Sequence, residues 1–401
     1  MDYDFITTCN WTATGTYTLR AYRGSSTDVV TSYSLFYRKK GTTPWTETTN
    51  GEVVISSTGE WEIGNDWNKD ANNNVLSHHY NETSYINSCT SITYDETALG
   101  TTVGAYFLYG LFDRCYNLST IGADALLPVG LTTVGTQFLT YTFRYISITS
   151  LPDNFNIPPL ITTIDTYFLS RTFYSCDLTS LPDDFQIPTG IAGDVNGHFL
   201  YSTFGWCQDL TSLPDDFQIP TGITDAGTNF LEDLFYRCSS LTSLPISFQL
   251  PTGITVAGRD FLEGTFHSCS NLTAMPVGFQ IPTGIAGDVY SDFMKYTWAY
   301  CSKLETMPVG FDIPSGITGV GSDFMDYTWY NCTALKNDGY TEPITFEFTT
   351  GTNTFGGTCP ITSDSPIVGT KETPVEIEVN RPSLSTITGV QTAQGINTIT
   401  F

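Results

Sequence analysis

The chain has 401 residues, of which 41 are acidic and 16 are basic, and its net charge is −25. Such an acidic surface repels nucleic-acid phosphates and anionic lipid headgroups, so we expect no nucleic-acid partner and no binding to a membrane surface. No apolar run approaches the ~20 residues that a transmembrane helix needs, which predicts no membrane insertion.

The first 77 residues carry no repeat, and they contain four segments rich in alternating aromatic and β-branched residues, at 16–23, 32–39, 52–56 and 59–63. Such segments are typical of strands, so we predict a β-rich N-terminal domain over residues 1–77. The stretch from 32 to 47 resembles the middle strands of a fibronectin type III or immunoglobulin-like sandwich. The first eleven residues lack the basic and apolar segments of a signal peptide. We expect a component assembled without a leader, with a mature product whose leader was removed as the alternative.

One frame, F-[LM]-x-x-x-[FW]-x-x-C-x-x-L-x-x-[LM]-P, recurs about every 31 residues in the range 78–336. A fixed period of this length is the signature of a solenoid, whose units bury apolar side chains only against their neighbours. A degraded unit at 79–93 precedes the regular ones, as terminal repeats often cap a stack. The second aromatic of the frame marks about eight units: Phe112, Phe143, Phe173, Phe204, Phe235, Phe266, Trp298 and Trp329.

Within one unit, Asn229 or Asp260 is a good N-cap residue, and Glu232 or Glu263 follows three positions later. This capping-box spacing predicts a short helix with one apolar stripe. A short extended run that ends at a proline follows the helix. It predicts one rung of a parallel sheet, with Leu pointing inward and a small residue outward. The outward column is Ser150, Ser180, Ser212, Ser243, Ala274 and Thr306.

A helix, a turn, a short strand and an apolar return together predict a leucine-rich-repeat solenoid of α/β units, flanked by β-rich N- and C-terminal domains or caps. The run F-x-x-C-x-x-L-T-S-L-P, with the following G-I-x-x-x-G, resembles the BspA-like leucine-rich repeats of bacterial and protozoan surface proteins. The resemblance covers residues 78–336, although these units are longer than that family's usual period. It implies a binding or adhesion surface rather than catalysis.

The frame stops after Leu335. Three later segments, 343–349, 375–379 and 397–401, have the composition of strands between Gly- and Thr-rich turns. We therefore predict a β-rich C-terminal cap or domain over residues 337–401, which would cover the exposed apolar side of the last repeat.

Seven of the ten cysteines occupy one repeat position, three residues after the second aromatic, and Ile146 fills that position in the remaining unit. A site that accepts Cys or Ile is small, apolar and buried, which predicts free thiols. No C-x-x-C pair or histidine cluster accompanies them, so we expect no zinc and no other cofactor. The redox states of Cys9, Cys89 and Cys359 stay open. The seven are Cys115, Cys176, Cys207, Cys238, Cys269, Cys301 and Cys332.

Paired aspartates recur in two adjacent units, at Asp183–Asp184 and Asp215–Asp216. Stacked carboxylates can bind Ca²⁺ or act as acid and base. Aspartate after proline is also an ordinary residue of a solvated turn, and no catalytic motif accompanies these pairs. We predict no enzymatic activity, with a carbohydrate-active enzyme as the second alternative.

The outward Ser and Thr column is small and uniform, so we expect recognition where the units differ. The predicted surface consists of Glu232, Asp233, Glu263, Lys295, Tyr296, Asp326 and Tyr327. The predicted function is that of a non-enzymatic structural or adhesive virion protein, such as a phage head, tail-fibre or decoration component. A cell-surface BspA-like adhesin is the alternative. The expected partner is a protein or glycan on a host or cell surface, or another virion protein, and a homo-oligomer is possible. The expected location is a virion surface or an extracellular or cell surface.

Overall fold

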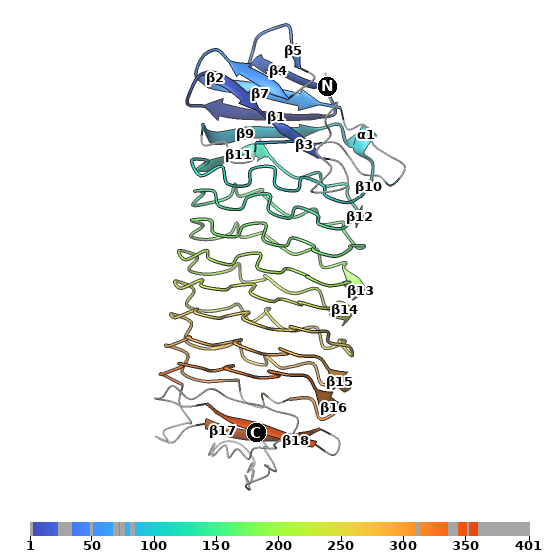
Figure 1. The fold of residues 1–401 in the computed structure, drawn as a ribbon, viewed down its shortest axis with the longest axis vertical. Helices are drawn as coiled ribbons and strands as arrows, with labels where there is room; N and C mark the ends of the chain where they lie inside the picture. Colours follow the sequence, from blue (N-terminus) through green and yellow to red (C-terminus); the bar gives the residue numbers. More distant parts are fainter. Residues whose placement is uncertain are drawn as a thin grey trace. The chain divides into compact units, whose positions relative to one another are not determined.

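The computed structural model describes residues 3–22, 34–48, 51–66, 72, 77–80, 85–308, 311, 313–335, 344–350 and 353–359. The chain divides into two compact units, Met1–Ile191 and Ala192–Phe401. Both units contain stacked coils of a β-solenoid, about seven turns in all (Figure 1). The solenoid expected from the repeat is therefore confirmed.

The first unit begins with a six-stranded sheet in the order β11-β9-β1-β7-β4-β5. Strand β1 (Phe5–Trp11) pairs antiparallel with β7 (Gly59–Asn65) and β9 (Ile86–Tyr94). The other strands of this sheet are β4 (Leu35–Lys39), β5 (Thr46–Thr48) and β11 (Thr120–Ala125). Two further pairs are β2 (Gly15–Thr18) with β6 (Glu52–Ile55), and β3 (Arg20–Tyr22) with β8 (Ser77–His79).

Strands occur in all four predicted segments. Single strands lie in 32–39, 52–56 and 59–63, whereas 16–23 is divided between β2 and β3, which pair with different strands. The large sheet also takes β9 and β11 from beyond residue 77. Strand β11 pairs parallel with β9, whereas the other described pairs of this sheet are antiparallel. The sheet thus changes at this edge to the parallel sense in which the coils follow one another.

The prediction of a short helix in each repeat unit is wrong. Residues 229–238 form successive turns, in which several residues adopt left-handed backbone angles. Asn229, Leu231 and Asp233 have φ values of 58°, 56° and 55°. The N–H groups of Asp233 and Phe235 donate to carbonyls of the next coil, at Glu263 and Thr265, both at 2.8 Å. An α-helix would direct these donors to the carbonyl four residues earlier.

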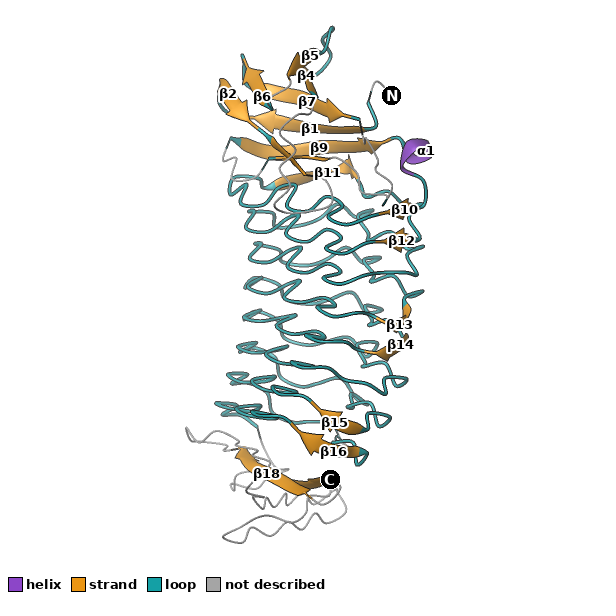
Figure 2. Ribbon diagram, turned by 45° about the vertical axis from the view of Figure 1, so that its right-hand side comes forward, coloured by secondary structure: helices purple, strands orange, loops and turns teal. Residues whose placement is uncertain are grey.

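The left-handed angle costs a residue with a side chain roughly 1 kcal/mol. The hydrogen bonds between coils offset that cost because each donates to a carbonyl that would otherwise be buried without a partner. The one helix among the described residues is α1 (Glu96–Leu99), which Asp95 caps by accepting from the N–H groups of Thr97 and Ala98, both at 3.0 Å. Figure 2 shows the remaining coil path as loop and short strand. No described helix is long and apolar enough to cross a bilayer.

The parallel strand pairs lie in the return segment of the repeat and not in the Pro-stopped run where we predicted them. They are β10 (Thr102–Val103) with β12 (Thr133–Val134), β13 (Ala192–Asp194) with β14 (Gly222–Asp225), and β15 (Gly287–Val289) with β16 (Ile317–Val320) (Figure 1). In the predicted run, the structure has single contacts such as the bridge from Ala274 to Thr306. Proline ends each run too early for a continuous ladder to form.

The core of each unit consists of aromatic rings stacked from coil to coil. In the second unit, Phe235 lies 5.8 Å from Phe204 and 5.9 Å from Phe266, and both ring pairs are stacked. The predicted inward residues Leu241 and Leu244 are buried, while Ser243 between them is exposed, as expected. Two further ladders are Phe199–Phe230–Phe261–Phe293–Phe324 and Phe217–Phe248–Phe279–Phe311.

Beyond the last coil, β17 (Ile344–Thr350) pairs antiparallel with β18 (Asn353–Cys359). The first of these corresponds to the strand predicted at 343–349. The strands predicted at 375–379 and 397–401 lie outside the described residues.

All seven cysteines of the repeat position are buried and free, as predicted, and so are Cys9 and Cys89. The thiol of Cys238 donates to the carbonyl of Phe204 at 3.1 Å, and that of Cys269 to the carbonyl of Phe235 at 3.1 Å. Burial raises the pKa of both thiols. The cysteine therefore fills a small apolar site and also satisfies a buried carbonyl of the preceding coil.

We expect the described thiols to resist alkylation in the native protein, because the thiolate is the reactive form and burial disfavours it. Iodoacetamide labelling followed by mass spectrometry should leave the repeat cysteines unmodified until denaturant is added. In denatured, unreduced protein, thiol titration should find at least nine free groups, the number of described free cysteines. Rapid native labelling of the repeat cysteines would contradict this placement.

Candidate functional site

The side chains between the buried aromatics form one surface of the second unit. In the coil at 229–238, Phe230, Leu231 and Phe235 are buried, whereas Glu232 and Tyr236 are partly exposed. The same positions in the following coils carry the rest of the predicted recognition residues. The predicted residues stand at two equivalent positions of successive coils, and the rings of Tyr296 and Tyr327 stack with their centroids 5.0 Å apart. They are Glu232, Asp233, Glu263, Lys295, Tyr296, Asp326 and Tyr327.

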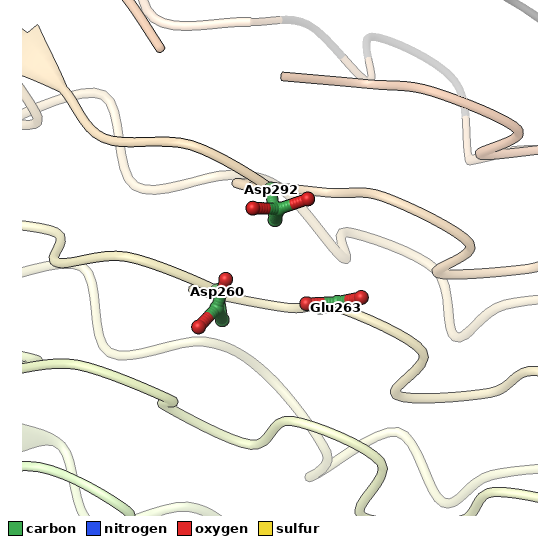
Figure 3. Close-up of side chains that lie close together, drawn as sticks. All are labelled: Asp260, Glu263 and Asp292. Atoms are coloured by element: carbon green, nitrogen blue, oxygen red, sulfur yellow. The ribbon is translucent and has the colours of Figure 1, made fainter. Parts of the chain in front are cut away.

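A carboxylate cluster lies at the start of these coils, and we define it as Glu232, Asp260, Glu263, Asp292, Asp323 and Asp326. Single carboxylate oxygens of Asp260, Glu263 and Asp292 all lie within 4.8 Å of one another (Figure 3). Lys295 Nζ donates to Asp292 Oδ1 at 2.7 Å and to Asp323 Oδ2 at 3.0 Å. Carboxylate oxygens are the ligands that Ca²⁺ takes, so these three groups have the chemistry to hold a hard cation.

Partial burial, followed by mutual repulsion, raises the pKa of two carboxyls of this cluster, those of Glu263 and Asp326. Burial, followed by the charges of Glu232, Asp260 and Asp292, raises the pKa of Glu263 to about 8. Burial and the charge of Asp323 raise the pKa of Asp326 to about 6. Burial acts to lower the pKa of Lys295, but its hydrogen bonds to two aspartates outweigh that effect and raise it.

The sequence reasoning did not include Asp260, Asp292 and Asp323 in the site. They occupy the position before the first aromatic of the frame, where Asn229 and Asp260 are predicted as helix N-caps. Asn229 Nδ2 donates to Asp260 Oδ2 at 3.0 Å in the next coil, and it also contacts Glu232. The signal was available in the sequence as an acidic column at one repeat position, because Asp recurs there in three successive units.

The wild type is expected to lose stability between pH 4.5 and about 8 as Glu263 ionises. The Glu263→Gln variant should not show this loss. The folded-state pKa of Glu263 is raised above its usual 4.5, so its stabilising effect is complete below pH 4.5 and is lost as the pH rises through about 8. At pH 9 the variant should be more stable than the wild type by about 1–2 kcal/mol, allowing for partial solvation of the carboxyl. Thermal denaturation followed by circular dichroism measures this.

The exposed Glu305→Gln substitution removes the same charge elsewhere on the surface and serves as the control. Its effect on the free energy of unfolding at pH 9 should be smaller than that of Glu263→Gln. A stability difference between Glu263→Gln and the wild type that is the same at pH 4.5 and at pH 9 would show that the cluster does not hold the proton.

A groove beside the cluster, which we call the aromatic groove, has a volume of about 850 Å³. It crosses several coils of the second unit. The residues that line it lie in or near the F-x-x-C part of each repeat. Of the predicted residues, only Tyr296 lines it. The lining residues are Gln208, Tyr236, Arg237, Ser239, His267, Ser268, Ser270, Tyr296, Tyr300, Ser302 and Asn331.

The rings of the groove contact one another from coil to coil. The ring centroid of His267 lies 4.9 Å from that of Tyr236 and 5.3 Å from that of Tyr300. The rings of Tyr300 and Tyr330 are nearly perpendicular, with their centroids 5.2 Å apart. Burial and the nearby Arg237 charge lower the pKa of His267 to about 4, so its imidazole is neutral near pH 7. The groove therefore presents a series of uncharged rings, one or two from each coil.

Arg144 of the first unit and Arg237 of the second make different contacts. In the first unit, Arg144 forms two hydrogen bonds of 2.8 Å with the carboxylate of Asp113 and also lies over the ring of Tyr141. In the second unit, the guanidinium of Arg237 lies 4.3 Å from the ring centroid of Trp206. Arg237 makes no ion pair with a described carboxylate. Its charge is therefore open to a ligand.

The predicted alternative site lies on another part of each coil. Asp183 and Asp184 are exposed and line a shallow pocket of about 390 Å³ in the first unit, together with Ser150 and Ser180 of the hydroxyl column. Asp215 and Asp216 are exposed turn residues of the second unit.

No family model, no curated protein and no solved structure matches this chain. The similarity to BspA-like repeats therefore rests on the repeat motif alone.

Proposed function

We propose that this protein is a non-enzymatic recognition protein, displayed on the surface of a virion or a cell, that binds its ligand through the aromatic groove. The observation that carries the proposal is the convergence of Tyr236, Arg237, His267, Tyr296 and Tyr300 in one groove. Tyr and Arg are among the residues that dominate binding energy in protein recognition.

The fold supports binding because it holds these side chains in place before a ligand arrives. The backbone that bears Tyr236 and Arg237 is hydrogen-bonded to adjacent coils, for example from Arg237 N to His267 O at 2.8 Å. A ligand then does not have to order a loop, and less of the binding free energy is lost to conformational entropy. The lining residues include no carboxylate beside His267, which favours binding over acid–base catalysis.

Two features favour a virion component over an exported adhesin. The buried thiols are free, which suits a protein that folds in the reducing cytoplasm, where disulfides are rare. Only 14% of the residues are charged, and the hydroxyl column forms a uniform face suited to packing against another chain of an assembly. An adhesin of the BspA-like kind remains the alternative.

Binding of the labelled full-length protein to a printed array of glycans and peptides tests the proposal. Wild-type protein should bind a subset of spots, and Tyr236→Ala and Tyr300→Ala should weaken that binding about tenfold or more, as expected for central aromatic contacts. Ser243→Ala, on the exposed hydroxyl column, should bind like the wild type. Equal binding by the groove variants and the wild type would overturn the proposal.

The location is tested separately. If the protein is a structural virion component, it should be stoichiometric in purified virions by mass spectrometry. If it is instead recovered with the cell envelope, the adhesin alternative is favoured.

A further inference from the structure

The charge of the aromatic groove differs from that of the protein as a whole. The chain carries 41 acidic and 16 basic residues, yet none of the residues that line this groove is acidic and one, Arg237, is a permanent cation. The carboxylate cluster stands beside the groove, where Lys295 neutralises part of it through Asp292 and Asp323. The lining of the groove thus combines a cation with no carboxylate.

Arg237 is positioned as a receptor for an anion. Its Nε donates to the hydroxyl of Tyr236 at 3.1 Å, and its guanidinium lies over the ring of Trp206 at 4.3 Å. These contacts orient the plane of the guanidinium, while no described residue accepts from its two terminal nitrogens. A planar guanidinium with two open N–H donors binds carboxylate or sulfate oxygens in a bidentate manner.

The rest of the lining matches the chemistry of sugars. A pyranose ring has apolar C–H faces that pack on aromatic rings, and a rim of hydroxyls that exchange hydrogen bonds with small polar side chains. The groove supplies the rings of Tyr236, Tyr296 and Tyr300 for packing against the sugar faces. For hydrogen bonds with the sugar hydroxyls it supplies four serines and two amides, namely Ser239, Ser268, Ser270, Ser302, Gln208 and Asn331.

The repeat sets the direction of such a ligand. Neighbouring rings along the groove are separated by 4.9 Å from Tyr236 to His267 and by 5.3 Å from His267 to Tyr300. An oligosaccharide lying across the coils would therefore contact rings from more than one coil. A protein partner would instead favour a groove with a larger apolar centre.

We propose that the aromatic groove binds an acidic oligosaccharide, whose carboxylate or sulfate pairs with Arg237 and whose sugar rings stack on Tyr236 and Tyr300. This inference rests on the proposed recognition function and names the chemical class of its ligand.

Isothermal titration calorimetry with three probes tests it: a sulfated heparin tetrasaccharide, a tetragalacturonate and neutral cellotetraose. Wild-type protein should bind at least one acidic probe more tightly than the neutral one. Arg237→Gln should weaken binding of that acidic probe about tenfold or more, because it removes a charge-assisted pair, and should leave cellotetraose unaffected. Preference for the sulfated or the carboxylated probe identifies the anionic group.

Arg259→Gln is the matched control, since Arg259 is an exposed arginine of the same unit that does not line the groove. It should bind the acidic probes like the wild type. Equal effects of the two arginine variants would overturn the inference, because the whole-protein charge would then explain them. Equal affinity for acidic and neutral probes would overturn it too.

These outcomes are distinct from a failure of the proposed function. If Tyr300→Ala abolishes binding to the array while no acidic oligosaccharide binds the wild type, the groove recognises something else, and array peptides as the bound spots would indicate a protein. If Tyr300→Ala leaves binding to the array unchanged, the groove is not the recognition surface and both proposals fall.

Discussion

The Gly258→Ala substitution is expected to destabilise the second unit by about 3 kcal/mol or more, through a clash between coils. A Cβ at this position would lie 2.1 Å from the carbonyl oxygen of Gly227 and 2.8 Å from the amide nitrogen of Thr228. Both are backbone atoms of the preceding coil and have no rotamer by which to move away. The coils would have to separate, which would break the 2.9 Å hydrogen bond from Gly258 N to Gly227 O.

Urea denaturation followed by circular dichroism measures the effect, with Gly253→Ala as the control. A Cβ at Gly253 would approach the nearest backbone oxygen, that of Ile223, to only 3.4 Å, which is ordinary contact. The control should therefore unfold within about 1 kcal/mol of the wild type. Equal midpoints for the two variants would mean that the coils do not approach as closely as described.

Replacing Phe235 by alanine is expected to cost about 3–5 kcal/mol, the range for removing a buried phenylalanine. The ring is fully buried and stacked between Phe204 and Phe266, with the edge of Phe248 at a centroid distance of 5.9 Å. The cavity cannot close easily, because its walls are rings held by further coils on both sides. Each coil packs only against its neighbours, so losing this ring weakens the coupling between the coils on either side. The variant should therefore unfold over a wider range than the wild type.

Val277→Ala is the matched control, because that side chain is 82% exposed. It should change the free energy of unfolding by about 0.5 kcal/mol or less. Thermal and urea denaturation of both variants provide the comparison. A Phe235→Ala protein that unfolds with the midpoint and slope of the wild type would contradict a ladder of stacked rings.

Much of the packing could be read from the repeat. Phe235, Cys238 and Leu241 were expected to point inward and are fully buried, and Ser243 was expected outward and is exposed. A residue that must be apolar in every unit faces the core whichever backbone conformation carries it. For that reason the frame identified the solenoid and the free thiols without knowledge of the backbone.

The same frame misled us about the conformation of residues 229–238. Apolar residues at i, i+1, i+5 and i+8 fit one stripe of a helix, but they also fit a chain of turns in which left- and right-handed residues alternate. The deciding contacts are backbone hydrogen bonds to the next coil, such as Asp233 N to Glu263 O. They join residues about 30 positions apart and involve atoms that all residues share, so no local pattern reveals them.

The candidate site was predicted in part. Expecting recognition where the units differ selected Lys295, Tyr296 and their neighbours, which recur at equivalent positions of successive coils. It missed Tyr236, Arg237, His267 and Tyr300, the main lining of the aromatic groove. They fall between the second aromatic and the cysteine, where Trp, Tyr, His and Arg recur, and that bias toward aromatic residues was the available signal.

The sequence by itself determined that the chain repeats, which side chains enter the core and that the seven cysteines of the repeat position are free, because each of these follows from the side-chain chemistry at one repeat position. Only the tertiary structure decided that residues 229–238 form turns and not a helix, that the carboxylates of Asp260, Glu263 and Asp292 lie together, and that no described carboxylate pairs with Arg237. These properties depend on which atoms of one coil meet those of the next, and stacking creates such contacts only when the chain has folded.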